Sequence, residues 1–159
     1  MNNLKKIFCT YHLIFIIPIV YAIHMLEESF GFVHWVNVNI SPHFTTTNFH
    51  RNNLLMFVAS VSISFIAFKI QNRITAFLVT SWVFGLILNN AFFHIGGTLF
   101  FKKYSPGILS SMFIYLPFSL FLLRIMLKEK RLRINELVSS FFLGAICHYG
   151  FIYLDVLSS

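Results

Sequence analysis

The sequence predicts an all-α integral membrane bundle of about five transmembrane helices, with the N-terminus in the cytoplasm. Three observations carry this prediction: the composition, a series of long apolar stretches, and an uneven distribution of basic residues. Of the 159 residues, 57% are hydrophobic, 21 are Phe and only 11% are charged, whereas soluble domains carry about 25% charge. So few charges cannot cover a soluble domain, and the same composition excludes intrinsic disorder. The length predicts a single membrane domain over residues 1–159.

The apolar stretches define the expected spans, because a membrane-spanning helix needs about 20 mainly apolar residues. The stretches that qualify cover residues 7–26, 54–70, 74–93, 106–127 and 134–154. The first follows two lysines, as a signal peptide does, but its run is too long and lacks a small-residue cleavage site, so an uncleaved span is expected. The third either ends at Phe93 or continues to Phe101. The fifth is the weakest, because Glu136, His148 and Asp155 interrupt it.

The connections between these stretches are short, with one exception. Ser105-Pro106 is typical of a helix start, with a capping serine and a proline in the first helical position. The exception is residues 31–50, which alternate between aromatic and polar residues. Connections of this length without structure are uncommon and often functional. We expect an extracytoplasmic loop here, part of which lies on the membrane surface.

The basic residues predict the orientation, because Lys and Arg accumulate on the cytoplasmic side. With the N-terminus inside, nine basic residues fall on the cytoplasmic side: Lys5, Lys6, Lys69, Arg73, Arg124, Lys128, Lys130, Arg131 and Arg133. Three fall outside: Arg51, Lys102 and Lys103. A net charge of +7 is also found in nucleic-acid-binding proteins, but here the basic residues lie between apolar runs. The expected partner is therefore the lipid bilayer and not nucleic acid, and the expected location is a bacterial cytoplasmic membrane.

Polar residues of separate spans fall at one depth. At 1.5 Å per residue, His24, Asn90 and His148 each lie roughly 20–25 Å above the inner ends of their spans, and the inner half has no comparable set. Ionisable groups within a span are costly and are functional hypotheses by default. The sequence thus predicts one site in the outer half of the bundle. Its expected ligands are His24, His94 and His148, and its supporting residues are Asn90, His50 and Arg51.

The pattern His24-Met25-Leu26-Glu27-Glu28 supplies the carboxylates of this site, because positions three and four apart share a helix face. Two adjacent carboxylates repel each other when both are ionised, and a proton, an imidazolium or a metal cation would relieve this. Carboxylate and imidazole together suit Zn, Fe or Mn. Glu27 and Glu28 are the candidate catalytic groups. We expect Glu28 to face inward and Glu27 to face outward, where it would pair with Arg51. The alternative is a helix end at which both carboxylates face water.

These residues resemble a known family. His24-x-x-Glu27-Glu28 at the end of a first span is the signature of the HXXEE family of small multi-pass membrane proteins. Further motifs in this chain are similar to that family: Asn89-Asn90 with His94, then Tyr104-Ser105-Pro106-Gly107, then Leu116-Pro117. The similarity runs from His24 to Pro117 and extends to the whole chain. It implies a membrane fold and supports the selected positions, but the family has no assigned activity and supplies no reaction.

Two classes of function remain open. One is an enzyme in which the His/Glu site binds a divalent metal, or performs acid–base chemistry, on a lipid or another apolar small molecule. The other is a non-catalytic binder or carrier of an ion, a proton or a lipid head group, or a purely structural membrane subunit. No inverted repeat supports a transporter, although a homodimer would supply the missing symmetry. Neither a G-x-S-x-G elbow nor a P-loop is present in the sequence.

Overall fold

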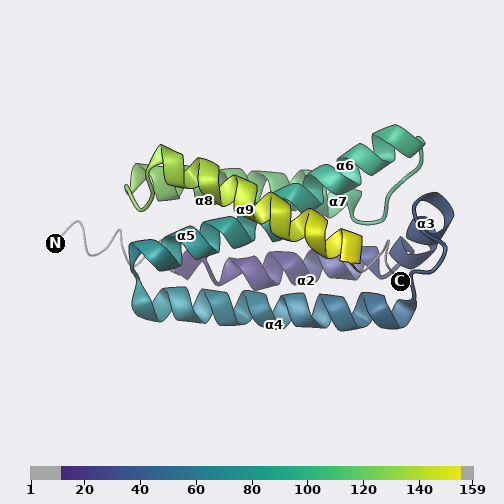
Figure 1. Cartoon of the computed structure of the whole chain (residues 1–159), viewed down its shortest axis with the longest axis horizontal. Coiled ribbons are helices and arrows are strands. Elements are labelled where there is room, and N and C mark those ends of the chain that lie inside the picture. The colour runs from purple at the N-terminus through teal and green to yellow at the C-terminus, as the bar shows by residue number, and fades with distance from the viewer. Residues whose placement is uncertain (1–11, 155–159) are drawn as a thin grey trace.

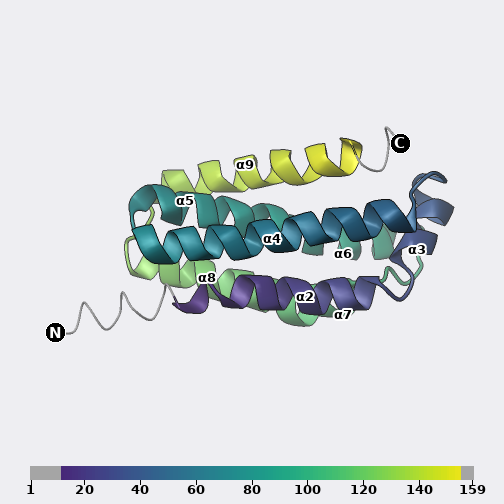
Figure 2. The ribbon, with the colours of Figure 1, turned by 90° about the horizontal axis from the view of Figure 1, so that it is seen from below.

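The computed structural model describes residues 12–154, and these fold almost entirely into helices. In chain order the elements are α2 (Ile16–Glu28), α3 (Phe32–Asn39), α4 (Thr46–Ile70), α5 (Arg73–Trp82), η1 (Val83–Asn89), α6 (Asn90–Phe101), α7 (Ile108–Ser110), η2 (Ser111–Tyr115), α8 (Leu116–Lys128) and α9 (Ile134–Ile152). No strand occurs within residues 12–154. The long helices lie side by side along the longest axis of the molecule (Figures 1 and 2). The all-α fold predicted from the sequence is confirmed.

Within residues 12–154, three helices are long and apolar enough to cross a membrane. They are α4, the continuous helix Arg73–Phe101 formed by α5, η1 and α6, and the helix Ile108–Lys128 formed by α7, η2 and α8. A fourth candidate is the pair α2 and α3, which is bent by 65°. The helix predicted over residues 74–93 therefore continues to Phe101. α9 falls outside this set, in line with the polar residues that interrupt its sequence, but it packs along α5 and η1.

The outer surfaces of the helices are strongly apolar. Large side chains such as Phe65, Phe113 and Ile146 stand exposed, with Phe113 showing 72% of its surface. The interior, in contrast, holds many buried polar groups, including Ser60, Ser64, Ser111, Ser119 and Ser140. Small polar residues between helices allow close approach, and apolar side chains on the outside suit a lipid solvent. This distribution supports the interpretation as a membrane protein.

The expected loop over residues 31–50 is largely helical. It contains all of α3 and the first turn of α4, so that only residues 40–45 separate the two helices. Thr45 caps α4 by accepting the backbone N–H of Asn48 at 3.1 Å, which is why this helix begins eight residues before the predicted residue 54. The aromatic residues of the segment do not form an open loop because Trp35, Val36, Phe44 and Phe49 pack into a small apolar cluster.

The middle of the third span contains a π-helical turn, η1. Its wider spacing leaves the carbonyl of Phe84 available, and Asn89 donates its side-chain amide to that oxygen at 2.6 Å. The turn lies against α9 at a contact between glycines. A Cβ on Gly85 would approach the Gly144 carbonyl to 2.9 Å, and one on Gly144 would approach the Gly85 nitrogen to 2.6 Å. These two glycines bring α9 and its His148 close to the rest of the bundle.

The two ends of the bundle differ in character. Lys130 and Arg131 lie beside Arg73 around a shallow polar pocket, and the turns after α4 and after α8 share this end with the start of α9 (Figure 1). Arg73 also binds Glu136 of α9 at 2.7 Å. The opposite end carries α3 and the end of α2. Cys147 on α9 is exposed.

Candidate functional site

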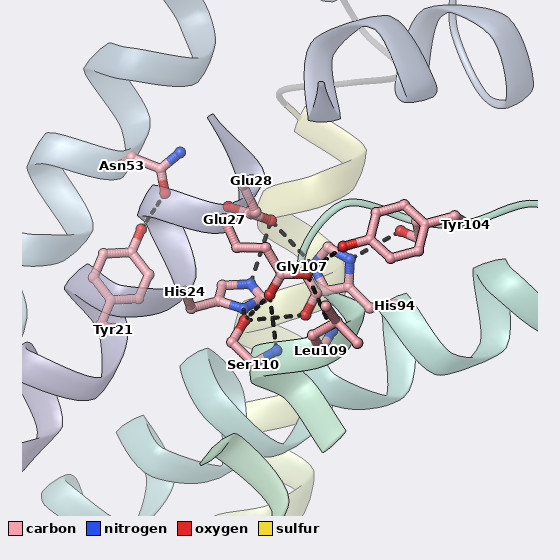
Figure 3. Close-up of polar contacts among 11 residues, drawn as sticks. Tyr21, His24, Glu27, Glu28, Asn53, His94, Tyr104, Gly107, Leu109 and Ser110 are labelled. Carbon is pink, nitrogen blue, oxygen red and sulfur yellow. Dashed lines mark hydrogen bonds and ion pairs between the residues drawn. The ribbon is translucent and has the colours of Figure 1, made fainter. Parts of the chain in front are cut away.

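The C-terminal end of α2 and the middle of α6 bring together His24, Glu28 and His94, and all three side chains are buried. Glu28 Oε1 lies 3.0 Å from His94 Nε2 and 3.4 Å from His24 Nε2. The two imidazole rings meet edge to face with their centroids 4.9 Å apart. Figure 3 shows Glu28 directed between the two rings. One carboxylate oxygen is therefore shared by two histidines from different helices.

A serine fixes the other nitrogen of each histidine. His24 Nδ1 lies 2.7 Å from Ser110 Oγ, and His94 Nδ1 lies 3.0 Å from Ser105 Oγ. Ser110 Oγ is also 2.5 Å from Glu27 Oε2. A serine has one hydroxyl hydrogen and a carboxylate can only accept, so Ser110 donates to Glu27 and accepts from His24 Nδ1–H. In neutral His24 the lone pair is consequently on Nε2, directed toward Glu28.

The two Nε2 atoms and Glu28 Oε1 form a group of possible metal ligands, in which the ligand atoms lie within 4.8 Å of one another. At 3.4 Å from Glu28, His24 Nε2 makes no hydrogen bond to any residue that the structure describes. Two electron pairs that face each other need a proton or a cation between them. Two imidazoles and one carboxylate are a ligand set suited to Zn, Fe or Mn. The serines would orient the imidazoles, as second-layer hydrogen bonds do in metal sites.

Glu27 has a different environment from Glu28, although the two are adjacent. It is partly exposed, and it accepts the backbone N–H groups of Leu109 and Ser110 at 3.1 and 2.8 Å. The hydroxyl of Tyr104 donates to the same carboxylate at 2.7 Å. Burial and this bond to Glu27 raise the pKa of Tyr104 to about 12, so its hydroxyl remains a donor at neutral pH. Glu27 thus ties α2 to the start of the Ile108–Lys128 helix, and it does not act as the second inward carboxylate.

The partner expected for Glu27 from the sequence was Arg51. In the structure Arg51 is exposed, and its Nε donates to Asn52 Oδ1 at 3.2 Å. The turn before Ile108 brings backbone N–H groups to Glu27, and the geometry of this turn could not be read from the residue spacing. The predicted inward orientation of Glu28 agrees with the structure, in which its side chain is only 5% exposed.

Gly107 lies close to the rings of both histidines. Its φ of +103° lies in the left-handed region, and a Cβ there would lie 2.7 Å from His94 Cε1 and 2.8 Å from His24 Cε1. Tyr115 stacks on the ring of His24, with ring centroids 4.3 Å apart. The rings of both histidines are therefore held in place by packing as well as by hydrogen bonds.

A cavity of about 330 Å³ adjoins the site, and Glu28 is part of its wall. Most of the wall is aromatic or aliphatic, with Phe32, Phe93 and Trp82 among its residues. Two of the predicted site residues, Asn90 and His148, line this cavity together with Glu28. Since the group of close ligand atoms consists of His24, Glu28 and His94, the structure places Glu28 in the position that the sequence assigned to His148.

His50 lies on another side of Glu28. It lines a polar pocket of about 490 Å³ with Glu28, His34, Asn37 and Thr46. Glu28 thus borders both an apolar cavity and a polar pocket. His50, which the sequence predicts as a supporting residue, lines this polar pocket and is not part of the ligand group of His24, Glu28 and His94.

Sequence reasoning did not select Ser110, Tyr115 or Tyr21. Ser110 carries the link between Glu27 and His24, and Tyr21 donates to Asn53 across to α4 (Figure 3). The sequence gives only a weak indication of these residues, since Ser110 and Tyr115 lie shortly after the Ser105-Pro106-Gly107 turn. In an apolar run, no pattern indicates which hydroxyl faces a histidine on another helix.

Removal of the Ser110 hydroxyl should weaken the site without unfolding the bundle. In Ser110→Ala, His24 Nδ1 loses its acceptor and the Nε2 lone pair is no longer fixed. We expect a 10–100-fold loss of affinity for a bound divalent metal, as is typical of second-layer partners. Titration of the purified variant with Zn²⁺ would measure this. Ser62→Ala on the exposed face of α4 is the matched control, and equal affinities for the two variants would contradict the assigned tautomer.

The comparison with protein families gives one match. Residues 15–122 match the family described as "Protein of unknown function with HXXEE motif". The matched region contains His24, Glu28, His94 and Ser110, and it ends before α9. A search of curated proteins and a search of solved structures gave no match. Because the family match covers more than half of the chain, the protein belongs to the HXXEE family, whose function is unknown.

Proposed function

We propose that the protein is a membrane enzyme that acts on a lipid or another apolar small molecule, with Glu28 as the reacting carboxylate. One observation carries the proposal: the Glu28 side chain contacts two buried imidazoles, and it also forms part of the wall of an apolar cavity. Catalytic sites of small-molecule enzymes typically combine a mostly apolar pocket with a few convergent polar groups. An apolar molecule in this cavity would bring its reacting atoms to Glu28.

The residues fit two forms of this chemistry. In the metal form, His24, His94 and Glu28 hold a divalent Zn, Fe or Mn, which supplies a Lewis acid or an activated water. In the acid–base form, Glu28 takes a proton from the substrate and an imidazole of His24 or His94 stores or returns it. In both forms Ser110 and Glu27 orient His24, and Ser105 orients His94.

A second candidate function is a non-catalytic binder or carrier of an ion, a proton or a lipid head group. The observation that favours it is the position of Glu28 between the apolar cavity and the polar pocket that contains His34 and His50. A carboxylate in this position can exchange a proton or a cation with the aqueous side without any reaction of the apolar ligand.

The metal content of the purified protein tests the metal form. We expect wild-type protein in detergent to retain a divalent metal, which elemental analysis would detect. His24→Ala and His94→Ala should lose the metal, whereas His43→Ala, at an exposed position between α3 and α4, should retain it. Wild-type protein that holds no metal after exposure to Zn, Fe and Mn would rule out the metal form.

Turnover separates the enzyme from the carrier. Membrane lipids incubated with wild-type protein and with Glu28→Gln would be compared by mass spectrometry. A product formed only by the wild type supports the enzyme. An unchanged lipid profile in both samples, together with retained metal, would contradict the enzyme and favour the carrier.

We further propose five spans with the N-terminus in the cytoplasm, and the arrangement of the charges supports this topology. The basic turns around Arg73 and Lys130 lie at one end of the bundle, and α9 runs alongside the membrane-length helices (Figure 2). Cysteines introduced at Lys130 and at Val38 should differ in intact cells: a membrane-impermeant reagent should label position 38 only. Labelling of position 130 from outside would contradict this orientation and indicate the opposite one.

A further inference from the structure

The apolar cavity contains polar atoms that the protein itself leaves without partners. Asn52 Nδ2, Asn90 Oδ1 and His148 Nε2 are buried and make no hydrogen bond to any of residues 12–154. All three residues line the cavity, and they come from three helices, α4, α6 and α9. A buried polar atom without a partner is costly, and native structures nearly always satisfy such atoms with protein, water or ligand. Three of them in one cavity are available to form hydrogen bonds with a bound molecule.

The hydrogen-bonding roles of these atoms restrict the bound group. Asn52 accepts Arg51 Nε with its Oδ1, so its free Nδ2 is a donor. Asn90 offers the free acceptor Oδ1. A hydroxyl group both donates and accepts, so its roles match the acceptor Asn90 Oδ1 together with a donor, either Asn52 Nδ2 or the N–H form of His148 Nε2. A carbonyl group lacks the hydrogen that Asn90 requires.

The charge of the wall restricts the molecule further. Among the described residues that line the cavity, Glu28 is the only carboxylate, His148 is the only imidazole, and none is Lys or Arg. An anionic group would be repelled by Glu28, with no Lys or Arg of the described wall to compensate. A cationic group would compete with the two imidazoles that Glu28 already contacts. The remaining wall is mainly aliphatic and aromatic, and 330 Å³ lies within the usual range of ligand pockets.

We propose that this cavity binds an uncharged lipid-like alcohol: an apolar body with a hydroxyl group held by Asn90 and by Asn52 or His148. This inference rests on the proposed function and names the class of its substrate or ligand. The hydroxyl group binds at the polar atoms of α4, α6 and α9, and the apolar body fills the space between Phe93 and Trp82. Asn52, Asn90 and His148 are thus specificity-determining residues, separate from the His24, Glu28 and His94 group.

Tryptophan fluorescence can test the proposal, because the chain has two tryptophans. Trp82 lines the cavity, whereas Trp35 packs in the aromatic cluster around α3. Trp35→Phe therefore leaves Trp82 as a reporter of the cavity, and Trp82→Phe leaves Trp35 as a control for non-specific partitioning. The probes are a bromoalkanol, a bromoalkane, a bromoalkanoate and a bromoalkylamine of equal chain length, since bromine quenches tryptophan on contact.

We expect the bromoalkanol to quench Trp82 at a concentration about tenfold lower than the bromoalkane, and to quench Trp35 no better than the bromoalkane. In Asn90→Leu and in the double variant Asn52→Leu/His148→Phe, this preference should fall to within about twofold of the bromoalkane. Quenching by the bromoalkane itself should persist in both variants, which shows that the cavity is still formed. Tyr149→Phe, which removes an exposed hydroxyl from the same helix as His148, should leave the preference unchanged.

Other outcomes would overturn the proposal. Equal quenching of Trp82 by bromoalkanol and bromoalkane would show that the polar atoms do not select a hydroxyl. A preference for the amine or for the carboxylate would assign a charged ligand instead. Failure of all four probes to quench Trp82 would show that the cavity does not admit a chain.

His24→Ala separates this inference from the proposed function. The variant removes a residue of the reacting group but leaves Asn52, Asn90 and His148 intact, so the bromoalkanol preference should persist while metal and turnover are lost. An alcohol preference in a protein that never turns over lipid would leave the inference valid and remove the enzyme. Turnover of a lipid without any alcohol preference would support the enzyme and contradict the inference.

Discussion

Glu28→Gln is expected to abolish the function of the site while the bundle remains folded. The amide has the shape of the carboxylate, but it cannot take a proton from a substrate, and it removes the negative charge shared by His24 and His94. Loss of a general base typically lowers turnover by about 10²–10⁴-fold. We expect a loss of that size in lipid turnover, and a fall in metal retention, because the only carboxylate of the described ligand group is gone.

Glu27→Gln is the matched control, because it makes the same chemical change one residue away. Glu27 holds the start of the Ile108–Lys128 helix and positions Ser110, so its loss should weaken metal binding and turnover by a smaller factor. A silent Glu28→Gln with a damaging Glu27→Gln would reverse the assignment of the two carboxylates. If both variants are silent, neither carboxylate takes part in the function and the enzyme proposal should be abandoned.

Gly107→Ala is expected to lower the free energy of unfolding strongly, for two separate reasons. A non-glycine residue at a φ of +103° is strained by about 1–3 kcal/mol. The new Cβ would also lie 2.7–2.8 Å from the rings of His94 and His24, and overpacking of this kind typically costs about 1–3 kcal/mol. Thermal unfolding in detergent should show a clearly lowered Tm.

Gly96→Ala provides the comparison, since a Cβ at Gly96 meets no described atom within 4 Å and the residue lies in α6. Alanine is the better helix former by about 1 kcal/mol, so this variant should be as stable as wild type or slightly more stable. Equal unfolding temperatures for the two variants would show that the turn at Gly107 does not press on the histidine rings.

Several features of the protein follow from the sequence alone. Apolar runs of membrane length predict the helices of α4, of Arg73–Phe101 and of Ile108–Lys128, because a backbone in lipid must satisfy its own hydrogen bonds. The spacing of His24 and Glu28 places both on one face of a helix, which depends only on helical geometry. The sequence also predicts a common depth for His24, Asn90 and His148, because this needs only the rise per residue and the ends of the spans.

The sequence did not determine how the spans are arranged around this site. Whether His148 or Glu28 completes the ligand group depends on the position of α9, which is set by the contact between Gly85 and Gly144. The partners of Glu27 depend on a turn with a left-handed glycine, and the link through Ser110 depends on which face of a uniformly apolar helix points inward. Local periodicity fixes the direction of a side chain relative to its own helix. Its neighbours on other helices are fixed by close packing, by π-helical turns and by irregular connections, and these are decided only when all the helices pack together.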